Sequence, residues 1–411
     1  MLKRSWLISV AILFGAVLAF AWFQRRALQE PVYRGRAVTA WARDMNSPDP
    51  NVRSNATLAF QAMGTNAVPR LIQNLERRDP ILKKPFLSLG PKLPLWVRRS
   101  FLRAFKPFDA AYDRLAAVNA LGAIGADAPA PPLLNALRDP DRQIAAQTAT
   151  ALGRIGKPAV PGLIGALHDN DGYVRSMACY SLSLIGPGAP EAAPALIQRF
   201  TDSYVNIPQQ AVDALGRMGR AATPALAEAL HHSDDRIRAL AARSLGAMGG
   251  QARDSVPALI EATKDPASPV RENAVAALGN VRPFSPETVG ALVAALKDQN
   301  TAVRIQATEG LARAGRLAAA AVPGLIESLN DKESKVRGEA AQALGQIGPP
   351  AKSAVPALSQ RLKDENESVR GKVREALRII DPDAAPPAAN DESGRKLEQS
   401  IMSHRKDILP P

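Results

Sequence analysis

Few residues in this 411-residue chain are of a type and spacing that could support catalysis or hold a metal. The four histidines are His168, His231, His232 and His404, and none of them is followed by a glutamate. The adjacent pair His231 and His232 supplies fewer ligands than a zinc site requires. The single cysteine, Cys179, excludes an intramolecular disulfide and the multi-cysteine zinc signatures, and we expect it to be a small packed residue. These residue types therefore predict no metal site.

Motifs for phosphate binding, acyl transfer and calcium binding are incomplete as well. Residues 156–158 read Gly-Lys-Pro, where a phosphate loop needs Ser or Thr after the Lys. No Gly-x-Ser-x-Gly nucleophile turn occurs. Residues 169–172 read Asp-Asn-Asp-Gly, which begins like a calcium loop but lacks its later Glu, and turn formation explains them better. The sequence thus predicts a protein that is not an enzyme and uses no cofactor or small-molecule substrate.

The residues that do recur at fixed spacing mark a repeat. Prolines stand 30 or 33 positions apart, with glycine in one slot: Pro131, Pro161, Pro194, Pro224, Pro257, Gly290, Pro323 and Pro356. Each repeat has two apolar segments of helical period separated by a polar turn. Proline suits the first turn of the first helix, and the final Gly of the Leu-Gly-x-Ile-Gly ending stops the second. Such a helix pair cannot bury its own apolar face, so the pairs must stack on one another.

These residues resemble the HEAT-like repeat, in the short form of the phycocyanobilin lyases. The shared pattern is an Asp eight residues after the Pro, then a Val-Arg pair five and six residues later. The Asp slots hold Asp139, Asp169, Asp202, Asp265, Asp298, Asp331 and Asp364, and the Arg slots hold Arg175, Arg238, Arg271, Arg304, Arg337 and Arg370. The resemblance implies a right-handed superhelix in which these side chains form a structural ladder between turns. The ladder is expected to be interrupted where His232 replaces Asp and where Ala145 and Pro208 replace Arg.

The sequence therefore predicts an all-α protein, an α-α superhelix of about ten helix pairs, preceded by one N-terminal transmembrane or signal helix. Arg114 stands 45 positions after Pro69, against 14 positions in the other repeats, which indicates an insertion of 31 residues at 81–111. The expected parts are an anchor or signal peptide at 1–26, a linker at 27–36, degenerate repeats at 37–126, regular repeats at 127–382 and a flexible tail at 383–411.

An apolar run from Trp6 to Phe23 follows Lys3 and Arg4. Its 18 residues would span about 27 Å as a helix, close to the bilayer core of roughly 30 Å. Residues 19–21 read Ala-Phe-Ala, which also fits a signal-peptide cleavage site. Two expectations follow. Residues 6–23 are an uncleaved single-pass anchor with the body outside the cytoplasm, or the protein is secreted after cleavage.

The formal net charge of +13 is concentrated near the N-terminus. Residues 1–36 carry +5 and residues 81–111 carry +6, whereas residues 112–382 carry only +2. A nucleic-acid groove along the repeats would need a basic stripe, so nucleic acid is not the expected partner. The insertion mixes basic and aromatic residues, among them Lys83, Lys84, Trp96, Arg98, Arg99, Phe101, Arg103, Phe105 and Lys106. These could cap the N-terminal repeats, bind an anionic membrane surface, or bind an acidic partner or nucleic acid.

One face of each second helix varies among repeats and is mostly polar. It is formed by positions 16, 19 and 23 after the proline, which share one side of a helix. Its candidate partner-binding residues are Gln147, Gln210, Asp213, Arg243, Asn273, Gln306, Glu309, Glu339 and Gln342. In HEAT-like proteins the second helices line the concave side that partners use.

The favoured hypothesis is a non-enzymatic protein-interaction scaffold, tethered to a membrane and binding protein partners on that face. One alternative is an accessory subunit of an enzyme system, of the bilin-lyase type, which rests on the family resemblance alone. The other is a protein that binds nucleic acid or an anionic surface through the basic insertion.

Overall fold

The computed structural model describes residues 30–78 and 110–384. The anchor expected at 6–23, the nine candidate membrane- or anion-binding residues of the insertion, and the tail from residue 385 lie outside these ranges. Within the two described ranges, no helix has both the length and the apolar character needed to cross a membrane. The chain divides into two compact units: unit 1 ends at Met218 and unit 2 begins at Gly219.

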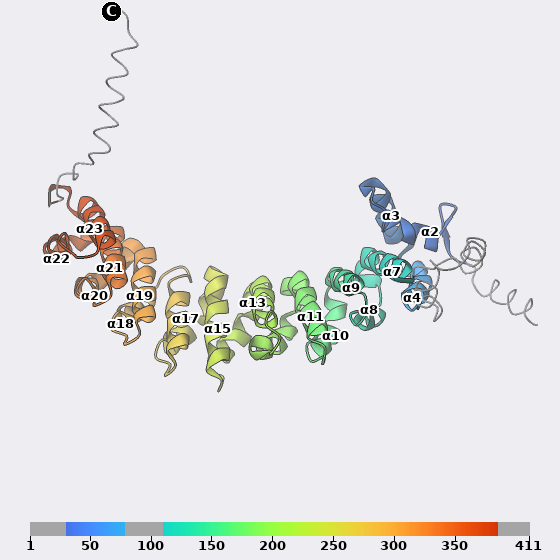
Figure 1. Cartoon of the computed structure of the whole chain (residues 1–411), viewed down its shortest axis with the longest axis horizontal. Coiled ribbons are helices and arrows are strands. Elements are labelled where there is room, and N and C mark those ends of the chain that lie inside the picture. The colour runs from blue at the N-terminus through green and yellow to red at the C-terminus, as the bar shows by residue number, and fades with distance from the viewer. Residues whose placement is uncertain (1–29, 79–109, 385–411) are drawn as a thin grey trace, which may run out of the picture. The chain divides into compact units, whose positions relative to one another are not determined.

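The described residues of unit 1 form a short hairpin and five helix pairs (Figure 1). The hairpin, within the expected linker region, pairs β1 (Val32–Tyr33) with antiparallel β2 (Arg36–Ala37). The helix pairs are α2 (Val38–Asp44) with α3 (Pro50–Met63), α4 (Val68–Leu75) with α7 (Ala110–Ile124), α8 (Ala130–Ala136) with α9 (Arg142–Ile155), α10 (Val160–Ala166) with α11 (Gly172–Ile185), and α12 (Ala193–Ile197) with α13 (Ile207–Met218).

Unit 2 has five further pairs in its described part. They are α14 (Thr223–Ala229) with α15 (Asp235–Met248), α16 (Val256–Ala262) with α17 (Ser268–Leu278), α18 (Pro286–Ala295) with α19 (Thr301–Ala314), α20 (Val322–Ser328) with α21 (Ser334–Ile347), and α22 (Val355–Arg361) with α23 (Glu367–Ile380). The prediction of an all-α solenoid of helix pairs is confirmed.

Short 3-10 helices connect these elements. In unit 1 they are η1 (Gly64–Ala67), η3 (Gly125–Asp127), η4 (Lys157–Ala159), η5 (Gly186–Gly188), η6 (Pro190–Ala192) and η7 (Gln198–Thr201). In unit 2 they are η8 (Gly219–Ala222), η9 (Gly249–Ser255), η10 (Gly315–Ala321), η11 (Pro349–Ala354) and η12 (Pro382–Ala384).

The repeat around α10 and α11 shows how the sequence sets helix ends. Pro161 lies in the first turn of α10, where its missing N–H has no intrahelical acceptor to lose. The side chain of Asp171 accepts the N–H of Tyr173 and caps α11. Gly186 ends α11 with a φ of 58°, a left-handed value that glycine adopts without a Cβ clash.

Helix α17 is shorter than the second helices beside it. Two repeats lack the terminal glycine: Arg282 occupies its slot after α17, which stops at Leu278 after 11 residues, and Asp381 occupies it after α23, which has 14 residues. Helices α15 and α19 on either side have 14 residues. Loss of the terminal glycine alone therefore does not account for the earlier end of α17.

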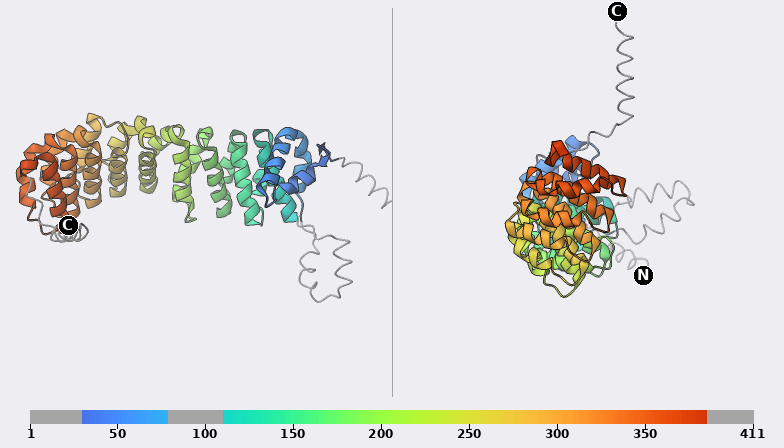
Figure 2. Two further views of the ribbon diagram at one scale, coloured as in Figure 1. Left: turned by 90° about the horizontal axis from the view of Figure 1, so that it is seen from above. Right: turned by 90° about the vertical axis from the view of Figure 1, so that its left-hand side faces the viewer.

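Within each unit, first helices pack along one row and second helices along another (Figures 1 and 2). Small residues let the second helices approach closely. A Cβ on Gly246 would lie 2.9 Å from the Ala277 Cα, and one on Gly279 would lie 2.8 Å from the Gly310 Cα. Fully buried leucines such as Leu163 fill the space between the two rows. The inward positions are thus committed to packing, which leaves the outward face of the second row for other roles.

Candidate protein-docking face

Arginine and aspartate side chains of successive repeats are joined by paired hydrogen bonds. In each pair, the Nε and Nη2 atoms of Arg donate to the two carboxylate oxygens of Asp at 2.7–3.2 Å. The pairs are Arg114–Asp139 and Arg175–Asp202 in unit 1, and Arg238–Asp265, Arg271–Asp298, Arg304–Asp331 and Arg337–Asp364 in unit 2. Such bidentate pairs are strong and fix orientation.

The arginine and aspartate side chains of the ladder also form hydrogen bonds with the backbone of their own turns. Arg337 Nη1 donates to the carbonyl oxygens of Asp331 and Lys332 at 3.0 and 3.2 Å. Asp364 Oδ1 accepts the N–H of Asn366 at 3.0 Å. The side chains of Arg337 and Asp364 are only 6% and 1% exposed, so their charges are used to hold the fold together.

The pKa values of the ladder carboxyls follow from this bonding. Hydrogen bonding from Arg271 holds the pKa of Asp298 below its usual range. Burial raises the pKa of Asp202, but hydrogen bonds from Arg175 and from the N–H of Tyr204 outweigh it, and the net shift is downward. These carboxylates therefore stay ionised at neutral pH, unlike a general acid.

The ladder departs from its regular pattern at three places. Asp169 follows the repeat that has Ala145 in the Arg slot, and its carboxylate is bonded instead by Arg138. The Nδ1 of His232, in an Asp slot, accepts the N–H two residues later at 3.0 Å, as the Asp carboxylates do. Arg370 bonds two carbonyl oxygens of its own turn, and no carboxylate in the described residues pairs with it.

The cysteine and the aspartates that could have supported catalysis or metal binding are buried or form turn hydrogen bonds. Cys179 is buried, and burial raises its pKa to about 12, so the nucleophilic thiolate is absent at neutral pH. In the calcium-like turn, Asp169 accepts the N–H of Asp171 at 2.8 Å, and Asp171 accepts that of Tyr173 at 2.8 Å. In the described part of the chain, no three His, Cys, Asp or Glu side chains are grouped as a metal site would need.

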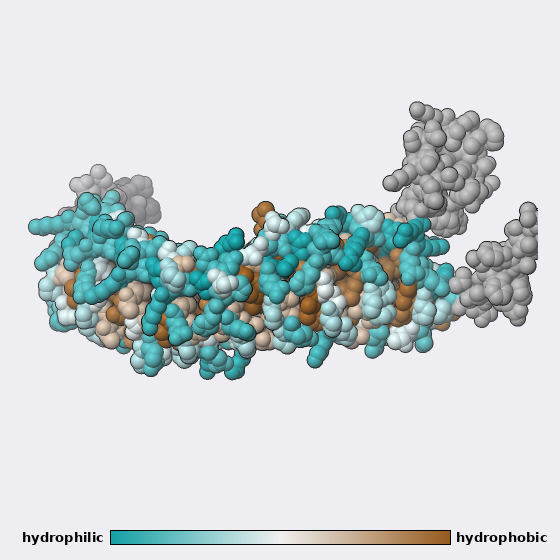
Figure 3. Space-filling model, turned by 90° about the horizontal axis from the view of Figure 1, so that it is seen from below, coloured by the Kyte–Doolittle hydropathy of each residue, from teal (hydrophilic) through white to brown (hydrophobic). Residues whose placement is uncertain are grey.

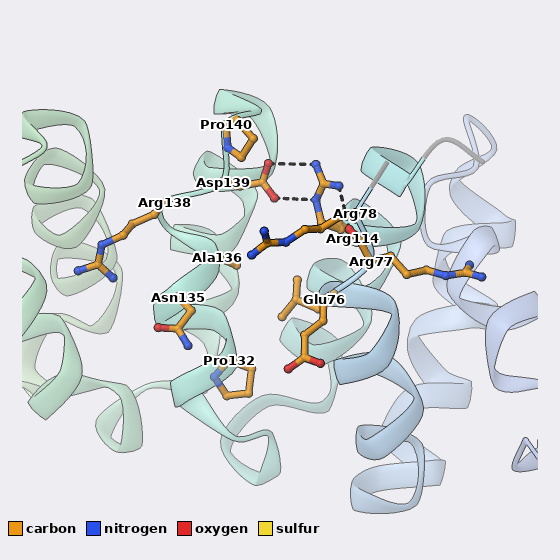
Figure 4. A pocket seen from close by; sticks show the side chains of 11 residues that line it. Glu76, Arg77, Arg78, Arg114, Pro132, Asn135, Ala136, Arg138, Asp139 and Pro140 are labelled. Carbon is orange, nitrogen blue, oxygen red and sulfur yellow. Dashed lines mark hydrogen bonds and ion pairs between the residues drawn. The ribbon is translucent and has the colours of Figure 1, made fainter. Parts of the chain in front are cut away.

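A cavity of about 600 Å³ lies between the end of α4 and α8 (Figure 4). Arg114 and Asp139 form one wall, and the Arg78 guanidinium extends across the space towards α8. Arg77, which also lines the cavity, is bonded to Asp113 at 2.5 Å. Its described lining combines four arginines with the carboxylates of Glu76 and Asp139 and includes no histidine, cysteine, serine or threonine.

In unit 2, several candidate partner-binding residues are bonded within the chain. Lys372 bonds Glu339 at 2.8 Å, Arg313 bonds Glu309 at 3.3 Å, and Asn273 Nδ2 donates to the carbonyl of Pro269 at 2.7 Å. Arg243 and Gln342 are exposed and Gln306 is half-buried. This part of the second-helix row is therefore polar and largely satisfied by its own neighbours.

In unit 1, the candidate residues lie on α9 and α13, on either side of α11. Gln147 is exposed and lines a hollow of about 420 Å³ together with Arg154 and Asn119. Asp213 is exposed and accepts a hydrogen bond from Gln209 at 2.7 Å. Gln210 is half-buried, and its Oε1 has no donor in the described residues.

Between these residues, α11 presents an apolar column that polarity alone did not mark as a site. Tyr180 and Leu184 are 40% and 38% exposed, and Met177 is partly exposed beside them. Arg154 and Arg217 occupy the position of Leu184 on the neighbouring helices. We name the nine outward residues of α9, α11 and α13 the unit 1 face: Gln147, Thr150, Arg154, Met177, Tyr180, Leu184, Gln210, Asp213 and Arg217.

Close backbone contacts fix the neighbours within the unit 1 face. A Cβ on Gly153 would lie 2.6 Å from the Leu184 Cβ, so Leu184 lies directly over α9. A Cβ on Gly186 would lie 3.2 Å from the carbonyl oxygen of Arg217, so the end of α11 touches α13. The apolar column is therefore bordered closely on both sides.

The side of the molecule seen in Figure 3 carries apolar residues in narrow strips between hydrophilic ones. Broad exposed apolar patches are what mark large hydrophobic interfaces. On that side, the strips do not form one broad patch.

Comparison with known proteins identifies the repeats. The family model of HEAT repeats matches residues 130–206, 194–279, 256–322 and 322–391, and that of the PBS lyase HEAT-like repeat matches residues 113–139. No curated protein matches the chain.

Solved structures share the fold at low sequence identity. A crystal structure of a mutant of the karyopherin Kap121p has a TM-score of 0.53 and 15% identity, covering 92% of this chain and 44% of the karyopherin. Kap121p bound to the extreme C-terminus of the protein phosphatase Cdc14p gives a TM-score of 0.51, 16% identity, and coverage of 89% and 43%. An engineered protein gives 0.39 at 20% identity, covering 84% of this chain and 98% of its own.

This chain spans less than half the length of the karyopherin, and the likeness shows the fold alone. The HEAT-repeat matches run from residue 130 to residue 391, well over half of the chain. Together with the helix pairs and the Arg–Asp ladder, they show that the chain belongs to the HEAT-repeat family.

Proposed function

We propose that this protein is a non-enzymatic interaction scaffold that binds protein partners on the outward side of its second helices. The observation that carries the proposal is that inward and outward residues of those helices have different roles. Their inward and turn residues make the packing and the ladder, whereas the side chains of outward residues such as Tyr180 and Arg217 form no hydrogen bond or ion pair with other described residues.

The unit 1 face is the favoured docking site. It combines an exposed apolar column with a polar hollow beside Gln147 and Arg154. Aromatic anchors within a polar rim are typical of residues that dominate binding energy. The equivalent positions in unit 2 include the internal pairs Lys372–Glu339 and Arg313–Glu309, which a partner would first have to break.

Cross-linking in the native cell tests the docking site. One variant carries Tyr180→Ser and Leu184→Ser on the unit 1 face, and the matched variant carries Arg243→Ser and Gln306→Ser on unit 2. We expect cross-links to partner proteins to be lost in the first variant and retained in the second, with unchanged helical circular dichroism in both. Equal retention in both variants would remove the unit 1 face from consideration.

We further propose that residues 6–23 tether the protein to a membrane with the repeats outside the cytoplasm. The support is the length and apolar character of that segment. The full chain should stay in the membrane pellet after carbonate extraction, whereas a chain lacking residues 1–29 should not. Protease added outside intact cells or spheroplasts should then digest the repeats. A soluble, shortened mature chain would support secretion after cleavage instead.

A further inference from the structure

We propose that the unit 1 face binds an extended acidic segment of a partner protein, with one apolar side chain seated between two carboxylates. This inference rests on the proposed function and specifies the chemistry of the partner. The apolar seat is the column of Met177, Tyr180 and Leu184 on α11. Tyrosine and methionine suit this role because tyrosine gives a large contact area at low entropy cost and methionine adapts its shape.

The positive charge beside the apolar column favours a partner segment with negative charge. Arg154 and Arg217 are exposed, and neither has an ion pair with any residue in the described ranges. The one acidic member of the face, Asp213, already accepts a hydrogen bond from Gln209. Two available guanidinium groups around an apolar centre favour carboxylates at the corresponding places on the ligand.

The spacing of the two arginines sets the length of the segment. They lie one helix to either side of α11, and neighbouring packed helices are about 8–10 Å apart. The two carboxylates must therefore bridge roughly 20 Å, which an extended chain covers in about six residues. The expected ligand is an extended segment with acidic residues about six positions apart and an apolar residue midway.

The hollow beside Arg154 supports this orientation. It is lined by Gln147 and Asn119 as well as Arg154, so it offers amide groups and a guanidinium to one end of the segment. The Arg154 stem lies near Gly122 on α7, 3.9 Å from where a Cβ on that glycine would stand. A carboxylate entering the hollow would thus meet the Arg154 guanidinium beside two side-chain amides.

A peptide-display selection on the full-length protein tests the proposal, with random twelve-residue peptides as the probe. Wild-type protein should enrich peptides with Asp or Glu about six positions apart around an apolar residue. The variant Arg154→Glu/Arg217→Glu should bind a selected peptide more than about tenfold more weakly and enrich Lys or Arg flanks instead. Tyr180→Ser should lose binding without any change in the preferred charge.

Matched variants in unit 2 serve as controls. Arg313→Glu lies at the equivalent helix position, and Leu317→Ser removes an apolar side chain that is 66% exposed. Both should select the same peptides as wild type. Selection of peptides without acidic flanks, or an unchanged preference in the double arginine variant, overturns the proposal. If Tyr180→Ser also loses cross-linked partners in cells in that case, the docking face stands and only the acidic chemistry fails.

Discussion

The ladder pair Arg337–Asp364 can be compared with an exposed ion pair of the same length, which tests whether burial determines how much an ion pair stabilises the fold. Its closest N···O distance is 2.8 Å, and its side chains are 6% and 1% exposed. The pair Lys297–Glu327 has the same distance of 2.8 Å but is 70% and 64% exposed. The substitutions Asp364→Asn and Glu327→Gln each remove one negative charge at nearly constant shape.

The two substitutions should differ strongly in cost. Asp364→Asn removes the buried carboxylate that Arg337 pairs with and leaves its guanidinium two carbonyl acceptors and the exposed carboxylate of Glu365 at 3.3 Å. Breaking a buried pair by removing one partner costs about 3–5 kcal/mol, and the retained carbonyl bonds place this case near 3 kcal/mol. An exposed pair such as Lys297–Glu327 contributes about 0.5 kcal/mol.

Urea unfolding of the full chain at pH 7, followed by circular dichroism, measures both free energies. In Asp364→Asn, hydrogen exchange should show reduced protection mainly in α21 and α23, because repeats contact only their neighbours. Because the pKa of Asp364 is lowered by its hydrogen bond from Arg337, the stabilisation is complete above the ordinary carboxyl value of about 3.9. It is lost as pH falls through the lowered pKa, so wild type and variant should converge in acid. Equal costs for the two substitutions at pH 7 would refute this reasoning.

Two further predictions concern packing and reactivity. Gly279→Ala should cost about 1–3 kcal/mol, because the new Cβ would lie 2.8 Å from the Gly310 Cα. Gly290→Ala, in a helix with nothing within 4 Å of the new Cβ, should be neutral or stabilising by about 0.5 kcal/mol, and the same urea assay compares them. Cys179 should resist iodoacetamide at pH 8 in the folded chain and react in 6 M guanidinium, because its folded pKa is about 12. Mass spectrometry measures that labelling, and fast labelling of the folded chain would contradict the burial.

Much of the fold follows from residues whose effect is local. Pro161 and Gly186 set helix ends through their own backbone geometry, so their spacing predicts the helix pairs. The replacement of a ladder arginine by another arginine cannot be predicted in this way, because it depends on side chains that are distant in sequence and meet only in the folded chain. Arg138 bonds Asp169 in place of the missing ladder arginine, and nothing in its own neighbourhood of sequence indicates this.

The candidate site shows the same division. Polar outward residues such as Gln147 can be predicted from their variation among repeats. The choice of polarity as the criterion passed over Tyr180 and Leu184, since apolar residues on a helix are usually buried. The repeat register places both residues on the outward face beside Arg154 and Arg217, and the packed structure gives their exposed fractions, 40% and 38%.

The ladder also relates repeat length to the way such a chain can grow. Every 33-residue step between successive proline slots carries a ladder arginine that pairs with an aspartate of the following repeat, whereas the two 30-residue steps lack that arginine. Those short steps use the brief connections η4 and η8, and most 33-residue steps use longer ones such as η9 and η10. A 33-residue segment carries an arginine for the next repeat, an aspartate for the previous one and the turn that orients both. In-frame duplication of such a segment would preserve every bond of the ladder while adding three new outward positions to be shaped by selection.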